Sequence, residues 1–108
     1  MKMKFYLSGP VSTDKNWSNK FKEYAKLIEE ANDHYKAINP MSDEHVKKKS
    51  GMDKVDRLSY DFLLLDKCDA IVLLPGWEEA SGCWAEWGYA MAKGLNIYVI
   101  DQCKKFKK

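Results

Sequence analysis

A continuous apolar run, "DAIVLLP" at residues 69–75, constrains the fold of this chain more than any other feature. A strand with one face in water alternates apolar and polar residues, whereas this run is apolar throughout, as in a strand covered on both faces. Shorter strand-like runs occupy residues 2–7 and 35–39, and "LNIYVID" at 95–101 is a fourth. The sequence therefore predicts a sheet with a fully buried central strand.

Segments with apolar residues at helical spacing separate these four runs. They cover residues 17–32, residues 53–67 and a stretch that begins at Ser81 and ends with Gly94 as its C-cap. Strands that alternate with helices form parallel sheets with right-handed crossovers. We therefore expect one α/β domain over residues 1–108, with the order βαβαβαβ, a four-stranded parallel sheet and helices on both faces.

Two polar segments are expected to lie outside the regular elements, and the composition limits the classes of partner and cellular compartment. Residues 41–52 have no periodicity and are expected to form a mobile loop, and residues 102–108 a solvated basic tail. A net charge of +2 is too small to indicate a nucleic-acid partner, and no apolar run has the ~20 residues of a membrane span. Three cysteines without CxxC spacing favour free thiols with packing roles in a cytoplasmic protein.

The loops after the first three strands carry turn formers and small polar residues. They are "SGP" at 8–10, "NPMS" at 39–42 and "PGWEEAS" at 75–81. In open parallel sheets, ligands bind beyond the carboxyl ends of the strands, where the strand order reverses. We therefore expect these three loops to meet at one crevice.

The crevice lacks the common cofactor motifs. The chain has neither GxGxxG nor GxxxxGK[ST], and His34 and His45 do not have metal-ligand spacing. We therefore expect neither a metal nor an organic cofactor. The candidates for chemistry are carboxylates: Asp61, Asp69, Glu78, Glu79 and Glu86.

Glu86 is the most informative of these carboxylates. Ser81 is a natural N-cap, so the first amides of the helix are expected to face the crevice and suit an anionic or oxygen-rich ligand. Trp84 and Trp87 flank Glu86 and give it an apolar setting, which would raise its pKa. The alternative is a surface glutamate of the helix that pairs with a nearby lysine.

The motif "SGCWAEWGYAMAKGLNIYVI", together with "FYLSGP" and "DFLLLDKCDAIVLLPGWEEASG", resembles the nucleoside 2-deoxyribosyltransferase superfamily. It is most similar to the short subgroup often found in phages and prophages (DUF4406-like), which is related to deoxynucleoside 5′-monophosphate N-glycosidases. The resemblance covers most of the chain outside residues 41–52 and the basic tail. It implies a flavodoxin-like or Rossmann-like α/β fold, and cleavage or transfer at the N-glycosidic bond of a 2′-deoxynucleoside or its 5′-monophosphate.

The resemblance assigns roles to three residues. Glu86 matches the nucleophile that forms a glycosyl ester with C1′ of the sugar, and Tyr6 matches the residue that orients it. Asp61 matches the aspartate that contacts the base, either as an acid or as a hydrogen-bonding partner. A carboxylate nucleophile splits one difficult displacement into two easier ones.

The resemblance also implies contacts with the substrate and with a second subunit. The residues expected to hold the sugar, the phosphate or the base are Ser8, Gly9, Pro10, Trp77, Ser81 and Gly82. Trp77 and Trp84 either stack on the base or pack at a subunit interface, and a homodimer or larger homo-oligomer is expected. Lys15 is a conjectural phosphate partner, and the single arginine, Arg57, has no evident place in the site.

A non-catalytic module competes with the enzyme hypothesis. The same crevice would serve a sensor or a sequestering protein that binds a nucleotide without changing it, and a third possibility is a structural part of an oligomer.

Overall fold

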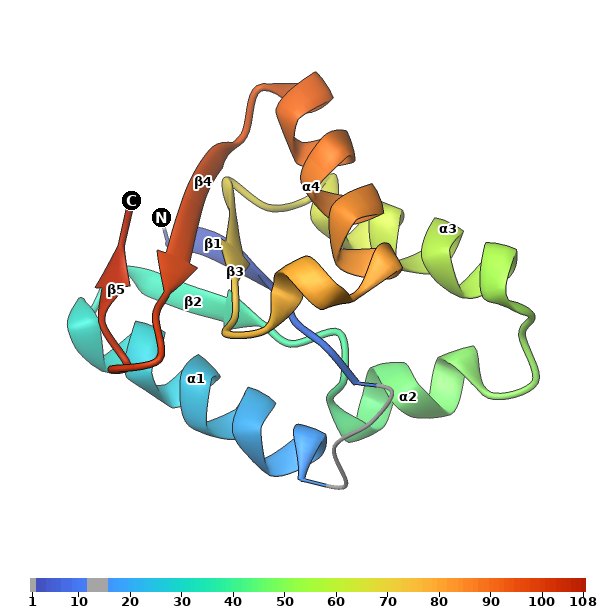
Figure 1. The fold of residues 1–108 in the computed structure, drawn as a ribbon, viewed down its shortest axis with the longest axis horizontal. Coiled ribbons are helices and arrows are strands. Elements are labelled where there is room, and N and C mark those ends of the chain that lie inside the picture. Colours follow the sequence, from blue (N-terminus) through green and yellow to red (C-terminus); the bar gives the residue numbers. More distant parts are fainter. Residues whose placement is uncertain (1, 12–15) are drawn as a thin grey trace.

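A computed structural model of the chain describes residues 2–11 and 16–108, and its centre is a mostly parallel sheet (Figure 1). The strand order is β2-β1-β3-β4-β5. The first four strands pair in parallel, and β5 pairs antiparallel with β4. The strands are β1 (Met3–Ser8), β2 (Tyr35–Ile38), β3 (Ala70–Leu73), β4 (Asn96–Ile100) and β5 (Phe106–Lys107).

Helices cover both faces of this sheet, with α1 on one face and α3 and α4 on the other (Figure 1). The helices are α1 (Trp17–Ala31), α2 (Asp43–Lys49), α3 (Lys54–Leu65), the short 3-10 helix η1 (Trp77–Glu79) and α4 (Ser81–Lys93). The α/β class and the helices on both faces are confirmed. The four-stranded parallel sheet is corrected to five strands, the last of them antiparallel.

Alternate residues of β1 divide the core into two layers. Phe5 and Leu7 pack with Phe21 and Ile28 of α1. Tyr6, between them in sequence, packs on the other face with Leu65 of α3 and Ala90 of α4. Successive side chains of a strand point to opposite faces. This alternation therefore carries Tyr6 toward α3 and α4, the helices that contain Asp61 and Glu86.

The strand order reverses at β1. The chain leaves β1 for β2 on one side and returns to β3 on the other, so β1 and β3 are neighbours with their carboxyl ends together. Ser8 pairs in register with Leu73 at this end of the sheet. This is the position at which ligands bind in open parallel sheets.

The segment 41–52, expected to be a mobile loop, contains helix α2. The Ser42 side chain caps it by accepting a hydrogen bond from the His45 amide. Asp43 and Glu44 lie in its first turn, and lysines occupy its last turn. Acidic residues at the start of a helix and basic residues at its end stabilise it through its dipole. The expectation of a loop was wrong because it relied on hydrophobic periodicity, and this helix has no apolar stripe.

The basic tail, expected to be solvated over 102–108, turns back to form β5. The Asp101 carboxylate accepts hydrogen bonds from the amides of Cys103 and Lys105, both at 2.9 Å, and so fixes the turn. Phe106 then packs against Phe5 and Tyr98, with ring centroids 5.5 and 5.1 Å away. One aromatic residue among lysines therefore orders the tail.

Within residues 2–11 and 16–108, no helix has both the length and the apolar character needed to cross a membrane.

The packing of Phe106 predicts that the tail contributes to stability. Phe106→Ala should lower the free energy of unfolding by about 2 kcal/mol, because it removes a partly buried ring from an aromatic cluster. Urea denaturation at neutral pH measures this change. Lys105→Ala, an exposed neighbour in the same tail, is the control and should change stability by less than about 0.5 kcal/mol. Equal stability of all three proteins would show that β5 contributes nothing.

Candidate active site

A cavity of about 660 Å³ lies at the carboxyl ends of the strands. Its lining includes Gly9 after β1, Pro40 and Met41 after β2, and Ser81 and Gly82 after β3. The three loops therefore meet at one crevice, as the sequence predicted. The size is within the range of small-molecule sites, roughly 300–1,000 Å³.

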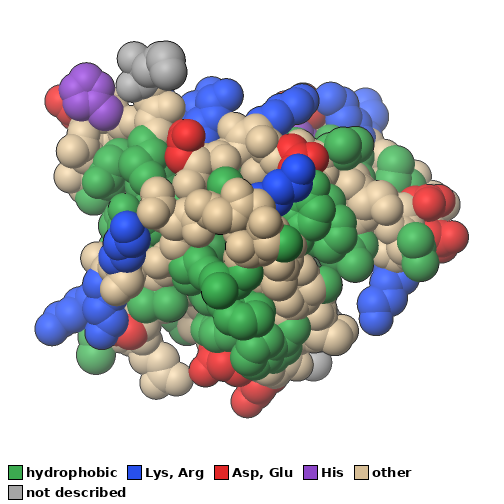
Figure 2. All heavy atoms as spheres, turned by 90° about the horizontal axis from the view of Figure 1, so that it is seen from above, with side chains coloured by type: hydrophobic (Ala, Val, Ile, Leu, Met, Phe, Trp, Pro, Cys, Tyr) green, Lys and Arg blue, Asp and Glu red, His purple; other side chains and the backbone are tan. Residues whose placement is uncertain are grey.

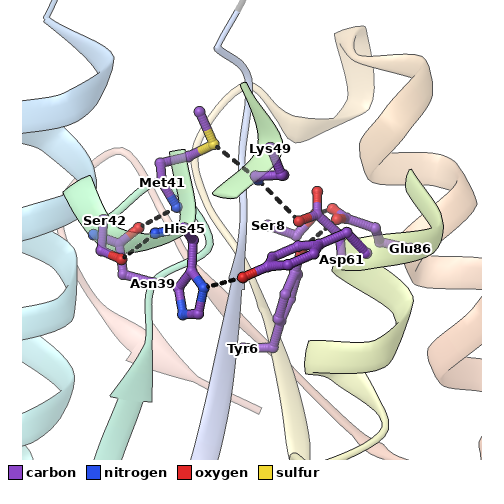
Figure 3. Close-up of polar contacts among 10 residues, drawn as sticks. Tyr6, Ser8, Asn39, Met41, Ser42, His45, Lys49, Asp61 and Glu86 are labelled. Carbon is purple, nitrogen blue, oxygen red and sulfur yellow. Dashed lines mark hydrogen bonds and ion pairs between the residues drawn. The ribbon is translucent and has the colours of Figure 1, made fainter. Parts of the chain in front are cut away.

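Glu86 is a buried carboxylate in the wall of this cavity. It belongs to α4 and is only 7% exposed. The Tyr6 hydroxyl donates a hydrogen bond to Glu86 Oε2, and the Ser8 hydroxyl donates one to Oε1 at 2.7 Å (Figure 3). Tyr6 and Ser8 follow each other on one face of β1, so a single strand supplies both donors. The alternative of a surface glutamate paired with lysine is excluded for Glu86.

The surroundings of Glu86 change its pKa. Burial raises the pKa to about 7, the hydrogen bonds from Ser8 and Tyr6 oppose the rise, and the nearby Asp61 charge adds to it. At neutral pH the group therefore exchanges between acid and carboxylate. Groups with such values are suited to acid, base or nucleophile roles.

Asp61 of α3 lines the same cavity and pairs with a buried lysine. Lys49 Nζ lies 2.9 Å from Asp61 Oδ1, and the two side chains are 7% and 16% exposed (Figure 3). Burial raises the pKa of Asp61 from its ordinary value, and the hydrogen bond and charge of Lys49 oppose that rise. The structure thus brings Tyr6, Asp61 and Glu86 together.

Lys49 was missed by the sequence analysis because it stands in a run of three lysines in the segment read as a loop. Arg57 and Lys54 of α3 also line the cavity. Arg57 lies one helical turn before Asp61, and this i, i+4 spacing was the available signal for its place in the site.

The expected ligand-binding residues fall into two groups. Gly9, Ser81 and Gly82 line the cavity. Ser8 is 1% exposed, and its hydroxyl is used by Glu86. Pro10 faces the loop after β3, where a Cβ added to Gly76 would lie 3.3 Å from Pro10 Cγ. Lys15 is outside the described residues.

Trp77 does not reach the cavity lining in the part of the chain that is described. It packs against the Tyr6 layer of the core, and its ring centroid lies 4.6 Å from that of Trp84. Trp84 in turn contacts Trp87 at 5.6 Å and donates its indole N–H to the Glu78 carbonyl at 2.8 Å. Trp77 therefore packs inside the chain, whereas Trp84 is 46% exposed, so packing at a subunit interface stays a prediction for Trp84.

The start of α4 differs by one residue from the expected N-cap. Ala80 occupies the cap position, and its carbonyl accepts from the Cys83 and Trp84 amides at 3.1 and 3.3 Å. No side chain caps this end. The Cys83 and Trp84 amides are thereby satisfied, and Ser81 and Gly82 are the first-turn residues whose amides have no acceptor within the helix.

Other reactive side chains are poor candidates for chemistry. Burial raises the pKa of Cys83 to about 11 and that of Cys68 to about 12, so both remain thiols at neutral pH. His45 Nδ1 lies 2.6 Å from the Tyr60 hydroxyl. Among the residues that the structure describes, no group of three or more His, Cys, Asp or Glu side chains is arranged to hold a metal ion.

A family model matches residues 3–99, which include all of these site residues. The family is described as Domain of unknown function (DUF4406), and the chain belongs to it. A search of curated proteins found no match. The family description names no activity, so the resemblance to nucleoside 2-deoxyribosyltransferases stays a prediction.

The raised pKa of Glu86 predicts a pH-dependent effect of its removal. The native state holds the proton more tightly than the unfolded chain, so wild-type stability falls as pH rises from about 4.5 to 7 and stays lower above that. Glu86→Gln lacks this loss. The unfolding free energy of Glu86→Gln minus that of wild type should therefore rise by at most about 3 kcal/mol from pH 5 to pH 8.

Urea denaturation at the two pH values measures this gain. Glu79→Gln, an exposed glutamate that also lines the cavity, is the matched control and should show no such gain. A Glu86→Gln protein whose stability follows wild type at both pH values would contradict the raised pKa.

Proposed function

We propose that this chain cleaves or transfers at the N-glycosidic bond of a 2′-deoxynucleoside or its 5′-monophosphate through a glycosyl ester on Glu86. The observation that carries the proposal is the buried Glu86 carboxylate, which faces a cavity at the strand-order reversal and has a hydroxyl donor on each oxygen. The match of Tyr6, Asp61 and Glu86 to the roles implied by the resemblance supports the same reaction.

The hydrogen bonds of Glu86 are compatible with attack on a sugar carbon. Each carboxylate oxygen accepts two hydrogen bonds, so a single donor on each oxygen leaves a lone pair free. Tyr6 and Ser8 fix the direction of the carboxylate before the reaction and reduce the cost of positioning it. Because the pKa of Glu86 is about 7, a large share of the protein holds the nucleophilic form at neutral pH.

The reaction then has two steps. A Glu86 oxygen forms a bond with C1′ while the bond from C1′ to the base nitrogen breaks, and its electron pair leaves with the base. Water, or the nitrogen of a second base, then attacks C1′ and releases the Glu86 carboxylate, and the proton that the attacking group loses passes through solvent to the departed base anion. The first acceptor gives hydrolysis and the second gives transfer. Asp61, in the lining of the same cavity, contacts the base.

The setting proposed for this reaction is a cytoplasmic homo-oligomer. The three cysteines are free, and Cys68 and Cys83 are buried thiols. On α4, Trp84 and Met91 are 46% and 53% exposed, and their spacing of seven residues places them on one side of the helix. Hydrophobic side chains gather in one area of the surface drawn in Figure 2. Such areas are where a second copy of a chain packs.

The central test of the proposal is the release of free base. Incubation with the four deoxynucleosides and their 5′-monophosphates, followed by chromatography, should yield base from at least one of them. Glu86→Gln should reduce the rate by at least about a thousandfold, because it removes the nucleophile and keeps the shape. With a slow 2-fluorinated substrate, intact-mass analysis should find a sugar adduct on Glu86.

Glu79→Gln, in the same cavity, is the control and should keep its activity. An adduct on another residue with full activity in Glu86→Gln would sink the proposal. Binding of a nucleotide by wild type and by Glu86→Gln without release of base would establish the sensor or sequestering module instead.

The start of α4 supports a preference for 5′-monophosphates over free nucleosides. Ser81 and Gly82 bring uncapped helix amides to the cavity, and Lys54 and Arg57 add positive charge to its wall. A Cβ added at Gly82 would meet no heavy atom within 4 Å, so the protein leaves open space there.

We therefore expect kcat/KM to be at least about tenfold higher for a monophosphate than for its nucleoside, since one charge-assisted hydrogen bond contributes roughly 1.5–3 kcal/mol. Gly82→Ala should reduce this preference, because the methyl group would occupy the space of the phosphate. Gly88→Ala is the matched control: it is on the same helix, has the same open surroundings and is not part of the cavity lining. Equal kcat/KM values for the two wild-type substrates would contradict a phosphate site.

A further inference from the structure

Lys49 is the one buried residue of α2, a helix whose other residues are exposed or half-buried. A lysine is rarely this buried unless its charge is paired. Its exposed neighbour Lys48 belongs to the same helical turn and forms an ordinary surface pair with Glu44 at 3.1 Å. The helix therefore points one particular lysine of the run 47–49 into the protein.

Lys49 contacts a residue of the cavity lining but is not part of that lining itself. Its ammonium group bonds to Asp61 Oδ1 at 2.9 Å, lies 3.8 Å from Met41 Sδ and stands 5.8 Å from the centre of the Tyr60 ring. Asp61 lines the cavity, whereas Lys49 is not part of the described lining. Lys49 thus acts on the cavity through one oxygen of Asp61 and leaves the other oxygen to a ligand (Figure 3).

Charged and titratable groups surround this pair from every packed element. They are Tyr6 on β1, His45 on α2, Arg57 and Tyr60 on α3, and Glu86 on α4. Two of these groups, His45 and Arg57, also favour the charged form of Asp61. Arg57 directs one guanidinium nitrogen to the Met52 carbonyl at 2.8 Å. Lys49 is therefore the cation in direct contact with Asp61 among the described residues.

We propose that Lys49 is a positioning residue of the site, which holds Asp61 as an oriented carboxylate so that Asp61 accepts a hydrogen bond from an N–H group of the base. This inference rests on the proposed function for the identity of the ligand. It decides between the two roles open to Asp61: beside a buried ammonium group, Asp61 is an acceptor and does not hand a proton to the leaving base. It also requires a base that offers an N–H donor on the edge facing Asp61.

The charge of Asp61 is measurable without a substrate. The experiment is a pH titration of the ¹³C-labelled aspartate carboxyl groups by NMR, with the Asp61 signal assigned from its absence in Asp61→Asn. In Lys49→Met the midpoint of Asp61 should move to higher pH by about 1–3 units, the usual effect of one adjacent opposite charge. Lys48→Met, from the same helix, is the matched control and should leave the midpoint where it is in wild type.

Two further variants keep the test decisive. Lys49→Arg restores a cation and should bring the midpoint back toward that of wild type. If Lys49→Met does not fold, Lys49→Gln keeps a hydrogen-bond donor, removes the charge and should show the same rise. An Asp61 midpoint that is equal in wild type, Lys49→Gln and Lys49→Met overturns the proposal.

The failure of the proposed function would look different. If wild type releases no base from any deoxynucleoside or monophosphate, the reaction is wrong, while the titration still decides the role of Lys49. If base is released, loss of the Lys49 charge should add the ionisation of Asp61 to the acid limb of kcat/KM, so that kcat/KM falls more steeply below pH 7 than the titration of Glu86 alone allows. A lysine that merely supported the fold would lower the active fraction and leave this limb in place.

Discussion

The contact between Glu86 and the two hydroxyl groups of β1 is the interaction on which the rest of the site depends. Burying a carboxylate is costly unless donors replace its lost water. Tyr6 and Ser8 supply those donors from 80 and 78 residues away in sequence. They can do so only because β1 lies beside β3, since only the short helix η1 separates β3 from α4, which starts at the same edge of the sheet. The strand order therefore creates the site, because it brings Tyr6 and Ser8 of β1 to Glu86 of α4.

The two carboxyl groups of the cavity have different electrostatic surroundings. Asp61 has an ammonium group in direct contact, whereas Glu86 has neutral hydroxyl donors and feels Lys49 only at longer range. Burial acts on both, but only Asp61 has a full opposite charge to balance it. Neighbouring carboxyls whose environments differ in this way take different roles in catalysis. The arrangement suits a fixed anion at Asp61 and a group at Glu86 that changes its protonation near neutral pH.

Much of this structure could be predicted from the sequence. The strands β1, β2, β3 and β4 and the helices α1, α3 and α4 follow from hydrophobic periodicity, because each buries an apolar face. The meeting of three loops at one cavity follows from parallel topology alone. The juxtaposition of Tyr6, Asp61 and Glu86 was reached through a family resemblance, and residue patterns by themselves singled out only Glu86. Trp77 was expected either to stack on the base or to pack at a subunit interface; it packs against the core instead, because a sequence does not tell whether an aromatic ring faces a cavity or the core.

The segments that escaped prediction share a physical cause. In α2 the buried residue is a lysine, so the helix has no apolar stripe for a periodicity argument to find, although its cap and its charge order are readable. In the tail a single ring, Phe106, orders a strand amid lysines. Both segments are stabilised by partners in other elements: Asp61 of α3 for α2, and Phe5 of β1 and Tyr98 of β4 for β5. A helix whose buried residue is charged shows no hydrophobic periodicity, so a wall of a site built from such a helix is missed by that criterion. Polar runs near a candidate cavity should therefore be examined for a lysine or arginine with a buried side chain.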